Sequence, residues 1–441
     1  MDVNSKTKDA LKSLAGFSLF TFATTIIRFG LRIAKNVVFT RVLGPAERGV
    51  FGLLTTIPDL IVSFGNLGFG LGSVYLVANK QYDMRKIVGN ILVFTLGAGF
   101  LMVGIGYVLF HFEGILKDNN DMVRGLAPFA LVIIPFVLLQ RFGEDLLTSI
   151  KKIHFLNRLN TLFSFLPIAL IVVFWLLTCK TLISALLAWA VSVLVVSVAA
   201  FISVSSEQGF RFGVSGAYFK EALFYGGRGF FSIFAGVLVK RIDYVFVSSM
   251  LGAESLGLYT VSVSLAEIIL SIPQALNLPF LPIRLGLAKE DASEFTPIVI
   301  RHVVFVMLVV CVCVAVGGKL IIFVMFGKRF LNAYHSLLWL LPGMIALSIH
   351  GFLKSDMYSH NLPGFVSWTE LTSLVVNVGL NYFYVIPMYG IEGAAFSSSV
   401  AYWLSTMIML VKYMSLSNIS FKDVLVIRRS ELKNIVKLIK R

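Results

Sequence analysis

An internal repeat constrains this chain more than any other feature, because most of its second half repeats the first half at an offset of 208 residues. The segment Leu43-Gly44-Pro45 aligns with Leu251-Gly252-Ala253. A polar stripe in an apolar background also recurs, with Thr56, Asp59, Ser63 and Asn66 aligned to Ser264, Glu267, Ser271 and Gln274. Spacings of three, four and three residues place each stripe on one face of a helix. Each half is therefore predicted to be one copy of the same helical bundle.

Composition places these bundles in a membrane. Hydrophobic residues make up 57% of the chain, charged residues only 14%, and the mean hydropathy is +0.87. A chain with so little polar surface is not expected to fold in water. Apolar segments of about 20 residues, long enough for a helix to cross the hydrocarbon core, lie at 14–38, 51–78, 87–110, 126–148, 155–178, 182–204, 218–248, 258–286, 299–326, 335–357, 364–387 and 392–414.

These segments predict an all-α polytopic membrane protein with about twelve transmembrane helices. The repeat divides them into two six-helix lobes related by pseudo-twofold symmetry, at 1–204 and 218–415, with a linker at 205–217. The remaining segment, 416–441, alternates apolar and basic residues. It is expected to lie on the inner membrane leaflet as an amphipathic tail, or alternatively to be a solvated tail.

The chain has a net charge of +15, and the positions of its Lys and Arg residues agree with the predicted topology. Most Lys and Arg residues outside the spans fall on one side of a twelve-span arrangement, whereas the loops on the other side hold few: Arg41, Arg48, Lys117, Arg124, Lys180, Lys328 and Arg329. Because cytoplasmic loops carry the excess of Lys and Arg, both termini are expected to be cytoplasmic. The charge is thus interpreted as a topology signal and not as a nucleic-acid-binding surface.

The sequence contains no recognisable catalytic centre. Its six histidines lack metal-site spacing, and it has no Gly-Lys-Ser/Thr phosphate loop. Cys179, Cys311 and Cys313 all lie in apolar segments, and their odd number argues against a disulfide framework. No metal and no enzymatic activity are therefore expected. A membrane glycosyltransferase or ligase is the enzyme alternative, and the short loops disfavour it.

Charged residues inside the spans carry the functional prediction. Arg28, Arg32 and Lys35 share one face of the first helix. Lys240, which is followed by Arg241, aligns with Arg32. A charge at mid-bilayer costs at least about 2.5–3.5 kcal/mol, so several on one face should point into a wet interior. A cationic substrate cavity is one interpretation. The alternative is structural ion pairing, in which Asp59 neutralises Arg32 and Glu267 neutralises Lys240, or snorkelling of Arg28 and Lys35 toward a helix end.

Two further features are of interest. Arg141, Glu144 and Asp145 close the fourth span and are expected to mark the cytoplasmic interface. The sequence Gly226-Gly227-Arg228-Gly229 near the start of the seventh span predicts a close backbone approach, because glycine has no side chain to keep a neighbour away.

Three segments resemble the Wzx-like polysaccharide-lipid flippases of the multidrug/oligosaccharidyl-lipid/polysaccharide (MOP) exporter superfamily. They run from Thr40 to Gly52, from Leu251 to Tyr259, and from Val376 to Ala395, the last including Ile386-Pro387-Met388-Tyr389-Gly390. The resemblance covers nearly the whole chain and implies two lobes in a V. It also implies alternating access and transfer of an undecaprenyl-pyrophosphate-linked oligosaccharide across the bacterial cytoplasmic membrane, for O-antigen, capsule or exopolysaccharide assembly.

The resemblance also implies roles for the intramembrane charges. A basic lumen is carried over to Arg28, Arg32, Lys240 and Arg241, which would bind the pyrophosphate through charge-assisted hydrogen bonds. Asp59, Glu267 and Asp243 would then be candidates for coupling to H⁺ or Na⁺, and they also fit plain salt bridges. The implied partners are the lipid-linked glycan, a polysaccharide polymerase and a chain-length regulator, with the flippase itself monomeric.

Two other transporter classes of the same superfamily remain as alternatives. A multidrug exporter would need an acidic, aromatic-lined cavity for organic cations, and the surplus of Arg and Lys argues against it. A peptidoglycan-precursor flippase would resemble a fourteen-span plan, whereas about twelve spans are counted here.

Overall fold

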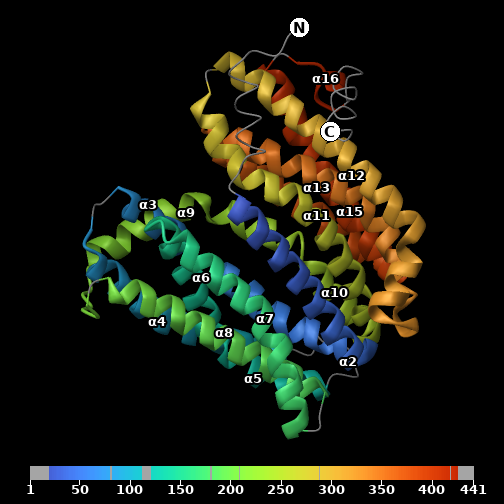
Figure 1. Cartoon of the computed structure of the whole chain (residues 1–441), viewed down its shortest axis with the longest axis horizontal. Helices are drawn as coiled ribbons and strands as arrows, with labels where there is room; N and C mark the ends of the chain where they lie inside the picture. Colours follow the sequence, from blue (N-terminus) through green and yellow to red (C-terminus); the bar gives the residue numbers. More distant parts are fainter. Residues whose placement is uncertain are drawn as a thin grey trace.

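The structure is a computed structural model that describes residues 19–79, 82–111, 121–178, 181–207, 209–287, 289–417 and 419–425. All regular secondary structure within these ranges is helical (Figure 1). Most of the basic tail, Cys179 and the first part of the predicted span 14–38 lie outside the described residues.

The first half of the chain forms one helical bundle, coloured blue to green in Figure 1. Its helices are α2 (Leu19–Gly65), α3 (Phe69–Ala78), α4 (Met84–His111), α5 (Asp121–Val132), α6 (Ile134–Ser149), α7 (Ile153–Thr178) and α8 (Thr181–Ser206). Two pairs are bent spans, with an angle of 58° between α2 and α3 and of 44° between α5 and α6.

The second half forms most of the other bundle and is coloured from yellow-green to red in Figure 1. It contains α9 (Gly216–Leu238), α10 (Ile242–Leu251), α11 (Ala253–Gly286), α12 (Lys289–Phe326), a 3-10 turn η1 (Lys328–Phe330), α13 (Ala333–Ser359), α14 (Pro363–Leu380), a π-helical turn η2 (Asn381–Val385), α15 (Ile386–Ser417) and α16 (Phe421–Leu425). In Figure 1, α9 reaches across to lie beside α3, whereas α10 lies in the second bundle.

The aligned glycines Gly44 and Gly252 have the same backbone conformation. Gly44 interrupts α2 with φ 72° and ψ 174°, and Gly252 precedes α11 with φ 86° and ψ 177°. Positive φ values of this kind favour glycine, which has no Cβ to clash. Both glycines thus turn the chain between two helical segments at equivalent places in the repeat. Gly390 interrupts α15 in a similar way with φ 58°.

The structure gives a different count of membrane-spanning helices from the twelve that the sequence predicts. Among the described helices, seven are long and apolar enough to cross a membrane, or up to nine when each bent pair counts as one span. The breaks at Gly44 and Gly390 fall between the predicted spans 14–38 and 51–78, and between 364–387 and 392–414. Twelve spans therefore remain a prediction, whereas an all-helical, multi-pass membrane fold is confirmed.

The two lobes meet where α2 crosses α11. At this crossing a glycine of each helix packs against a backbone oxygen of the other helix. A Cβ added to Gly49 would lie 1.8 Å from the backbone oxygen of Ala253, and one added to Gly257 would lie 1.8 Å from that of Pro45. In the repeat, Gly49 aligns with Gly257 and Pro45 aligns with Ala253. A reciprocal contact between equivalent residues is what a twofold axis produces. The predicted pseudo-twofold relation is confirmed.

A second close contact joins α3 to α9. A Cβ on Gly226 would lie 1.9 Å from the backbone oxygen of Gly68, and one on Gly72 would lie 1.9 Å from that of Ala222. The close approach predicted for the Gly226-Gly227-Arg228-Gly229 segment is therefore confirmed. Along α2 and α3, these contacts lie on opposite sides of the segment that carries Thr56, Asp59 and Ser63.

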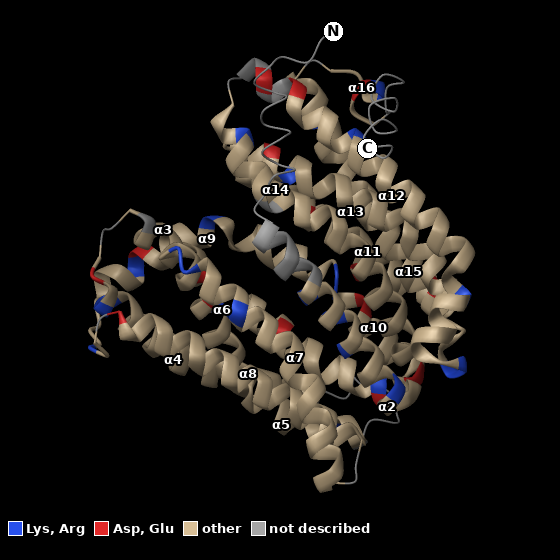
Figure 2. Ribbon diagram, in the orientation of Figure 1, with Lys and Arg blue, Asp and Glu red and all other residues tan. Residues whose placement is uncertain are grey.

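The exposed surface matches a lipid environment. Large apolar side chains are highly exposed on outer helices, including Val316 at 83% and Leu177 at 73%. A soluble protein rarely exposes contiguous apolar surface on this scale. Figure 2 shows long stretches of helix without charge, with Lys, Arg, Asp and Glu concentrated near helix ends and between the lobes. These features identify a multi-pass membrane protein.

Candidate functional site

A cationic cavity lies between the two lobes. Its larger part has a volume of about 270 Å³ and is lined by residues of α2, α7, α8, α10 and α11 together with Arg241. A smaller part of about 80 Å³ is lined by residues of α2, α10, α11, α13 and α15 together with Lys240. Both parts share Arg32 and Glu267. The cavity is thus built from both halves of the repeat.

Because α2 is broken at Gly44, cations from the segments on both sides of the break line the same cavity. Arg32 and Lys35 lie on the segment before Gly44, and Arg48 lies on the segment after it, yet all three line the larger cavity. The Lys35 Nζ lies 5.5 Å from the centre of the Phe163 ring, and the Arg48 guanidinium lies 5.6 Å from that of Phe51. Aromatic faces attract such cations and help to hold them in place.

Glu267 is the carboxylate that links the lobes. The Arg32 Nη2 of α2 donates to one of its oxygens at 3.0 Å, and the Arg241 Nη2, at the start of α10, contacts the other at 2.6 Å. All three side chains are partly exposed. Two guanidinium groups on one carboxylate leave a local surplus of one positive charge.

The ion pairs differ from those that the structural alternative predicted. Asp59 does not pair with Arg32; its carboxylate accepts a hydrogen bond from Arg141 Nη2 at 3.1 Å, and Arg141 also donates to Ser63 at 2.9 Å. Glu267 pairs with Arg32 and Arg241. These pairings could not be predicted from the sequence, because the partners lie on different helices and the rotation of one helix against the other is set by packing. Arg141 therefore holds the α2 stripe to α6 in addition to lying near the end of its span.

The two cations aligned by the repeat come together at one cavity. Arg32 and Lys240 both line its smaller part, as their equivalent positions suggested. Arg28 lies one turn before Arg32 on α2, is partly buried, and lines neither part of the cavity. Of the four cations named from the sequence, Arg32, Lys240 and Arg241 therefore lie at the cavity.

Asp243 lies deeper in the second lobe than the other two candidate acids. Its side chain is 1% exposed and accepts hydrogen bonds from the Tyr244 backbone N–H at 2.9 Å, from the Ser398 hydroxyl at 3.2 Å and from the Tyr259 hydroxyl. Asn377 donates to Ser398 at 3.5 Å. Asp243 also lines the smaller cavity. A buried carboxylate surrounded by neutral donors can exchange a proton or bind a cation without first breaking a salt bridge.

Two cavity residues were missed as binding candidates. Lys35 was recognised on the charged face of the first span but was not named among them, and Arg48 was assigned to an outer loop. Arg48 is in fact 7% exposed, and its Nη2 lies 3.4 Å from Asn36 Oδ1. The Gly44-Pro45 pair is the signal that could have placed it, because a helix break there turns the following segment back toward the first. Among the described residues, no group of three or more His, Cys, Asp and Glu side chains is arranged to hold a metal ion.

Comparison with known proteins agrees with this architecture. A family model described as "Polysaccharide biosynthesis protein" matches residues 38–335, which include most of the cavity-lining residues. The chain belongs to this family.

Relatives in sequence and structure support the same assignment. A Shigella flexneri protein named "Putative O-antigen transporter" is 22% identical over 418 residues, covering 89% of this chain and 95% of that protein. An inward-facing multidrug resistance MATE family transporter of the MOP superfamily matches with a TM-score of 0.74 at 13% identity, over 89% of this chain and 98% of that one. The lipid II flippase MurJ, in an inward closed conformation, also gives 0.74, at 14% identity over 92% and 89% of the two chains.

The structural matches show that this member of the polysaccharide biosynthesis family has the fold of MOP superfamily transporters. Together the family model and these relatives confirm the resemblance to Wzx-like flippases of the MOP superfamily and support a role in polysaccharide transport. They also confirm the prediction that the protein is not an enzyme.

Proposed function

We propose that this protein moves an undecaprenyl-pyrophosphate-linked oligosaccharide across the bacterial cytoplasmic membrane by alternating access. The observation that carries the proposal is the charge of the interlobe cavity. Its lining residues include five cations, Arg32, Lys35, Arg48, Lys240 and Arg241, and three acids, Asp59, Asp243 and Glu267. The cations come from both lobes, so that an anion bound there contacts both.

The arrangement of the acids strengthens the preference for an anionic substrate. Asp59 is engaged with Arg141, Glu267 with two arginines, and Asp243 with hydroxyl and backbone donors. Asp59 and Glu267 are thus neutralised by arginines, and Asp243 is only 1% exposed, so the cavity offers little acidic surface to an organic cation. A pyrophosphate is compact and multiply negative, and guanidinium groups can bind its oxygens bidentately. The lipid tail would remain in the membrane. A multidrug exporter of organic cations is the weaker candidate for this cavity.

Two tight backbone contacts support alternating access. Along the chain, the α2–α11 crossing at Gly49 precedes the cavity-lining segment from Thr55 to Asp59, and the α3–α9 contact at Gly68 follows it. If each contact opened while the other stayed closed, the cavity would face one side of the membrane at a time. Close glycine contacts suit such a movement, because they separate without disentangling long side chains.

Among the candidate acids, Asp243 is the best placed for coupling to H⁺ or Na⁺. Asp59 and Glu267 already neutralise arginines, and protonating either would leave a guanidinium without its partner. Asp243 has hydroxyl and backbone partners that can accommodate either a protonated carboxyl or a cation. It also lines the cavity, so that ion binding and substrate binding can influence each other.

The cellular setting follows from the same proposal. The protein would reside in the bacterial inner membrane with both termini in the cytoplasm, as the Lys and Arg distribution favours. It would act as a monomer that delivers its glycan to a polysaccharide polymerase and a chain-length regulator. The identity of the glycan would be set by residues away from the cation cluster.

Replacing Arg32 or Lys240 with Ala tests the proposal. Each variant is expected to lose export of the surface polysaccharide at normal protein level. In the Arg32 variant Glu267 keeps Arg241 as its partner, so an unpaired carboxylate would not explain the loss. Lys319→Ala is the matched control, since Lys319 lies on α12 over the Tyr334 ring, outside the cavity.

Two results would contradict the proposal. Normal export by both variants would exclude a role for the cations in binding. Rescue of Arg32→Ala by the further change Glu267→Gln would show that the pair is structural. A drug-susceptibility assay in an exporter-deficient host separates the multidrug alternative, which predicts that the protein raises drug resistance.

A further inference from the structure

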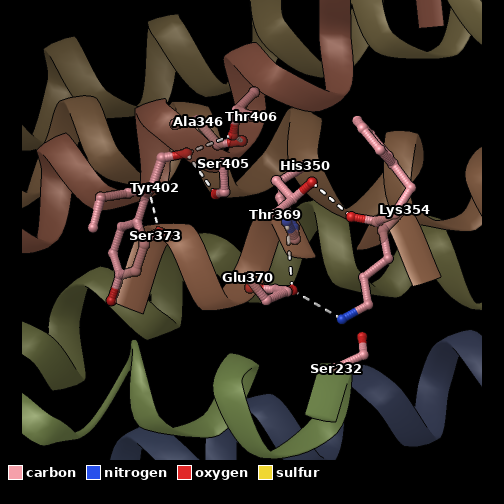
Figure 3. A network of polar contacts seen from close by, with 12 residues as sticks. Ser232, Ala346, His350, Lys354, Thr369, Glu370, Ser373, Tyr402, Ser405 and Thr406 are labelled. Atoms are coloured by element: carbon pink, nitrogen blue, oxygen red, sulfur yellow. Dashed lines mark hydrogen bonds and ion pairs between the residues drawn. The ribbon is translucent and has the colours of Figure 1, made fainter. Parts of the chain in front are cut away.

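A second buried charge cluster lies in the C-terminal lobe. Glu370 of α14 accepts a hydrogen bond from the Lys354 Nζ of α13 at 3.0 Å, and the same carboxylate oxygen lies 3.5 Å from His350 Nε2, one turn earlier on α13 (Figure 3). The Glu370 and His350 side chains are 7% and 9% exposed. An ionised group so deep in a membrane protein is a functional candidate by default.

His350 lies beside the same carboxylate without a hydrogen bond to it. Its Nε2 is buried and has no hydrogen-bond partner, and the nearest Glu370 oxygen lies 3.5 Å away. A protonated imidazole would donate to that oxygen at about 2.7–2.9 Å, as charge-assisted pairs do. The longer separation fits an imidazole without a net charge. His350 can therefore take up a proton beside an anion.

Lys354 connects this cluster to the cavity. Its side chain is 26% exposed, more than that of either partner, and Figure 3 shows its ammonium beside Glu370 of α14 and close to Ser232 of α9. On α9, a Cβ added to Gly236 would lie 3.5 Å from the Glu370 Oε1, and Lys240, four residues later in the chain, lines the smaller cavity. An anion held near Lys240 would therefore also attract Lys354.

We propose that His350 and Glu370 form a proton-binding site that fills when an anionic group in the cavity draws Lys354 away from Glu370. The proposal rests on the proposed function, because it takes the anion to be the pyrophosphate of the substrate. It adds the identity of one coupled ion, H⁺, and assigns it to residues separate from Asp243.

The charges balance at each stage. Before the anion binds, Glu370 is neutralised by Lys354 and His350 is neutral. When Lys354 moves to the anion, the His350 imidazole takes up one proton from solvent and becomes the cation that neutralises Glu370. When the anion leaves, Lys354 returns and the proton is released. Neither stage leaves a carboxylate unpaired in the membrane, which would be strongly unfavourable.

The groups around His350 permit this exchange. Lys354 is on the same helix as His350, Glu370 is on α14, and Lys240 follows α9. Glu267 of α11 and Tyr402 of α15 line the smaller cavity together with Lys240. Glu370 is the one acid in direct contact with His350 among these groups, so a protonated imidazole has a single anionic partner.

The test is proton uptake during binding of inorganic pyrophosphate to the purified full-length protein. Isothermal titration calorimetry at pH 7 in buffers of different ionisation enthalpy gives the number of protons taken up per bound ligand. The wild type is expected to take up about one proton more than His350→Asn or Lys354→Gln, because both variants lose the linked step. Comparison between variants cancels the titration of pyrophosphate itself. His335→Asn, an exposed histidine on the same helix, is the matched control and should behave as the wild type.

The outcomes separate the two proposals. Pyrophosphate binding with unchanged proton uptake in His350→Asn would overturn the proton site while leaving the proposed function in place. Absence of pyrophosphate binding to the wild type would contradict both. If His350→Asn does not fold, Lys354→Gln decides alone, since it keeps His350 and Glu370 and must still lose the extra proton.

Discussion

The contact at Gly49 offers a direct test of how the lobes move. Alanine normally stabilises a helix by about 0.8–1.0 kcal/mol relative to glycine. At Gly49, however, the new Cβ would lie 1.8 Å from Ala253 O, whereas ordinary contact begins at 3.4 Å. The α2 and α11 backbones would have to separate by roughly 1.6 Å, and overpacking of this kind costs about 1–3 kcal/mol. Gly49→Ala should therefore shift the equilibrium by about 5- to 150-fold toward states in which this contact is open.

Thiol cross-linking across the crossing measures that shift. In a background without Cys179, Cys311 and Cys313, cysteines would replace Val42 on α2 and Val324 on α12, which are both exposed. These sites lie close together, because Arg41 donates a hydrogen bond to the Val324 carbonyl. Gly49→Ala should slow cross-linking by a short bifunctional maleimide. Gly104→Ala is the control, since a Cβ there meets nothing within 4 Å. Equal cross-linking rates in the two variants would refute the argument that Gly49 sets the closure of this end.

Three further predictions follow from the same structure. Arg41 also donates to the Met325 carbonyl at 2.8 Å and so holds the end of α12 to the other lobe; Arg41→Gln should weaken closure of that end, and unchanged cross-linking would show that the contact is incidental. Asp243→Asn should reduce the dependence of transport on imposed pH or sodium gradients in proteoliposomes more than it reduces substrate binding, whereas unaltered gradient dependence would exclude Asp243 as a coupling residue. Reporter tags at residue 1 and after Arg441 should be cytoplasmic, and tags in 111–124 or near Lys328 should be external; an external terminus would contradict the predicted topology.

The sequence by itself determined the membrane class, the helical architecture and the twofold repeat. Hydropathy and helical periodicity are local properties, and a glycine at equivalent places in both halves reports a local backbone requirement that Gly44 and Gly252 both meet. The repeat also predicted that Arg32 and Lys240 occupy equivalent depths, and both line one cavity. The chain alone could therefore indicate where charges lie along each helix.

Only the tertiary structure decided which charges meet. Arg32 and Glu267 are 235 residues apart in the sequence and pair because α2 crosses α11 at the glycine contact. Asp59 pairs with Arg141 instead of Arg32, and the Lys354–Glu370–His350 cluster is brought together where α13 packs beside α14. The physical reason is that a salt bridge depends on the rotation and shift of one helix against another. Those quantities are set by side-chain packing over the whole interface and are not encoded in the periodicity of either helix.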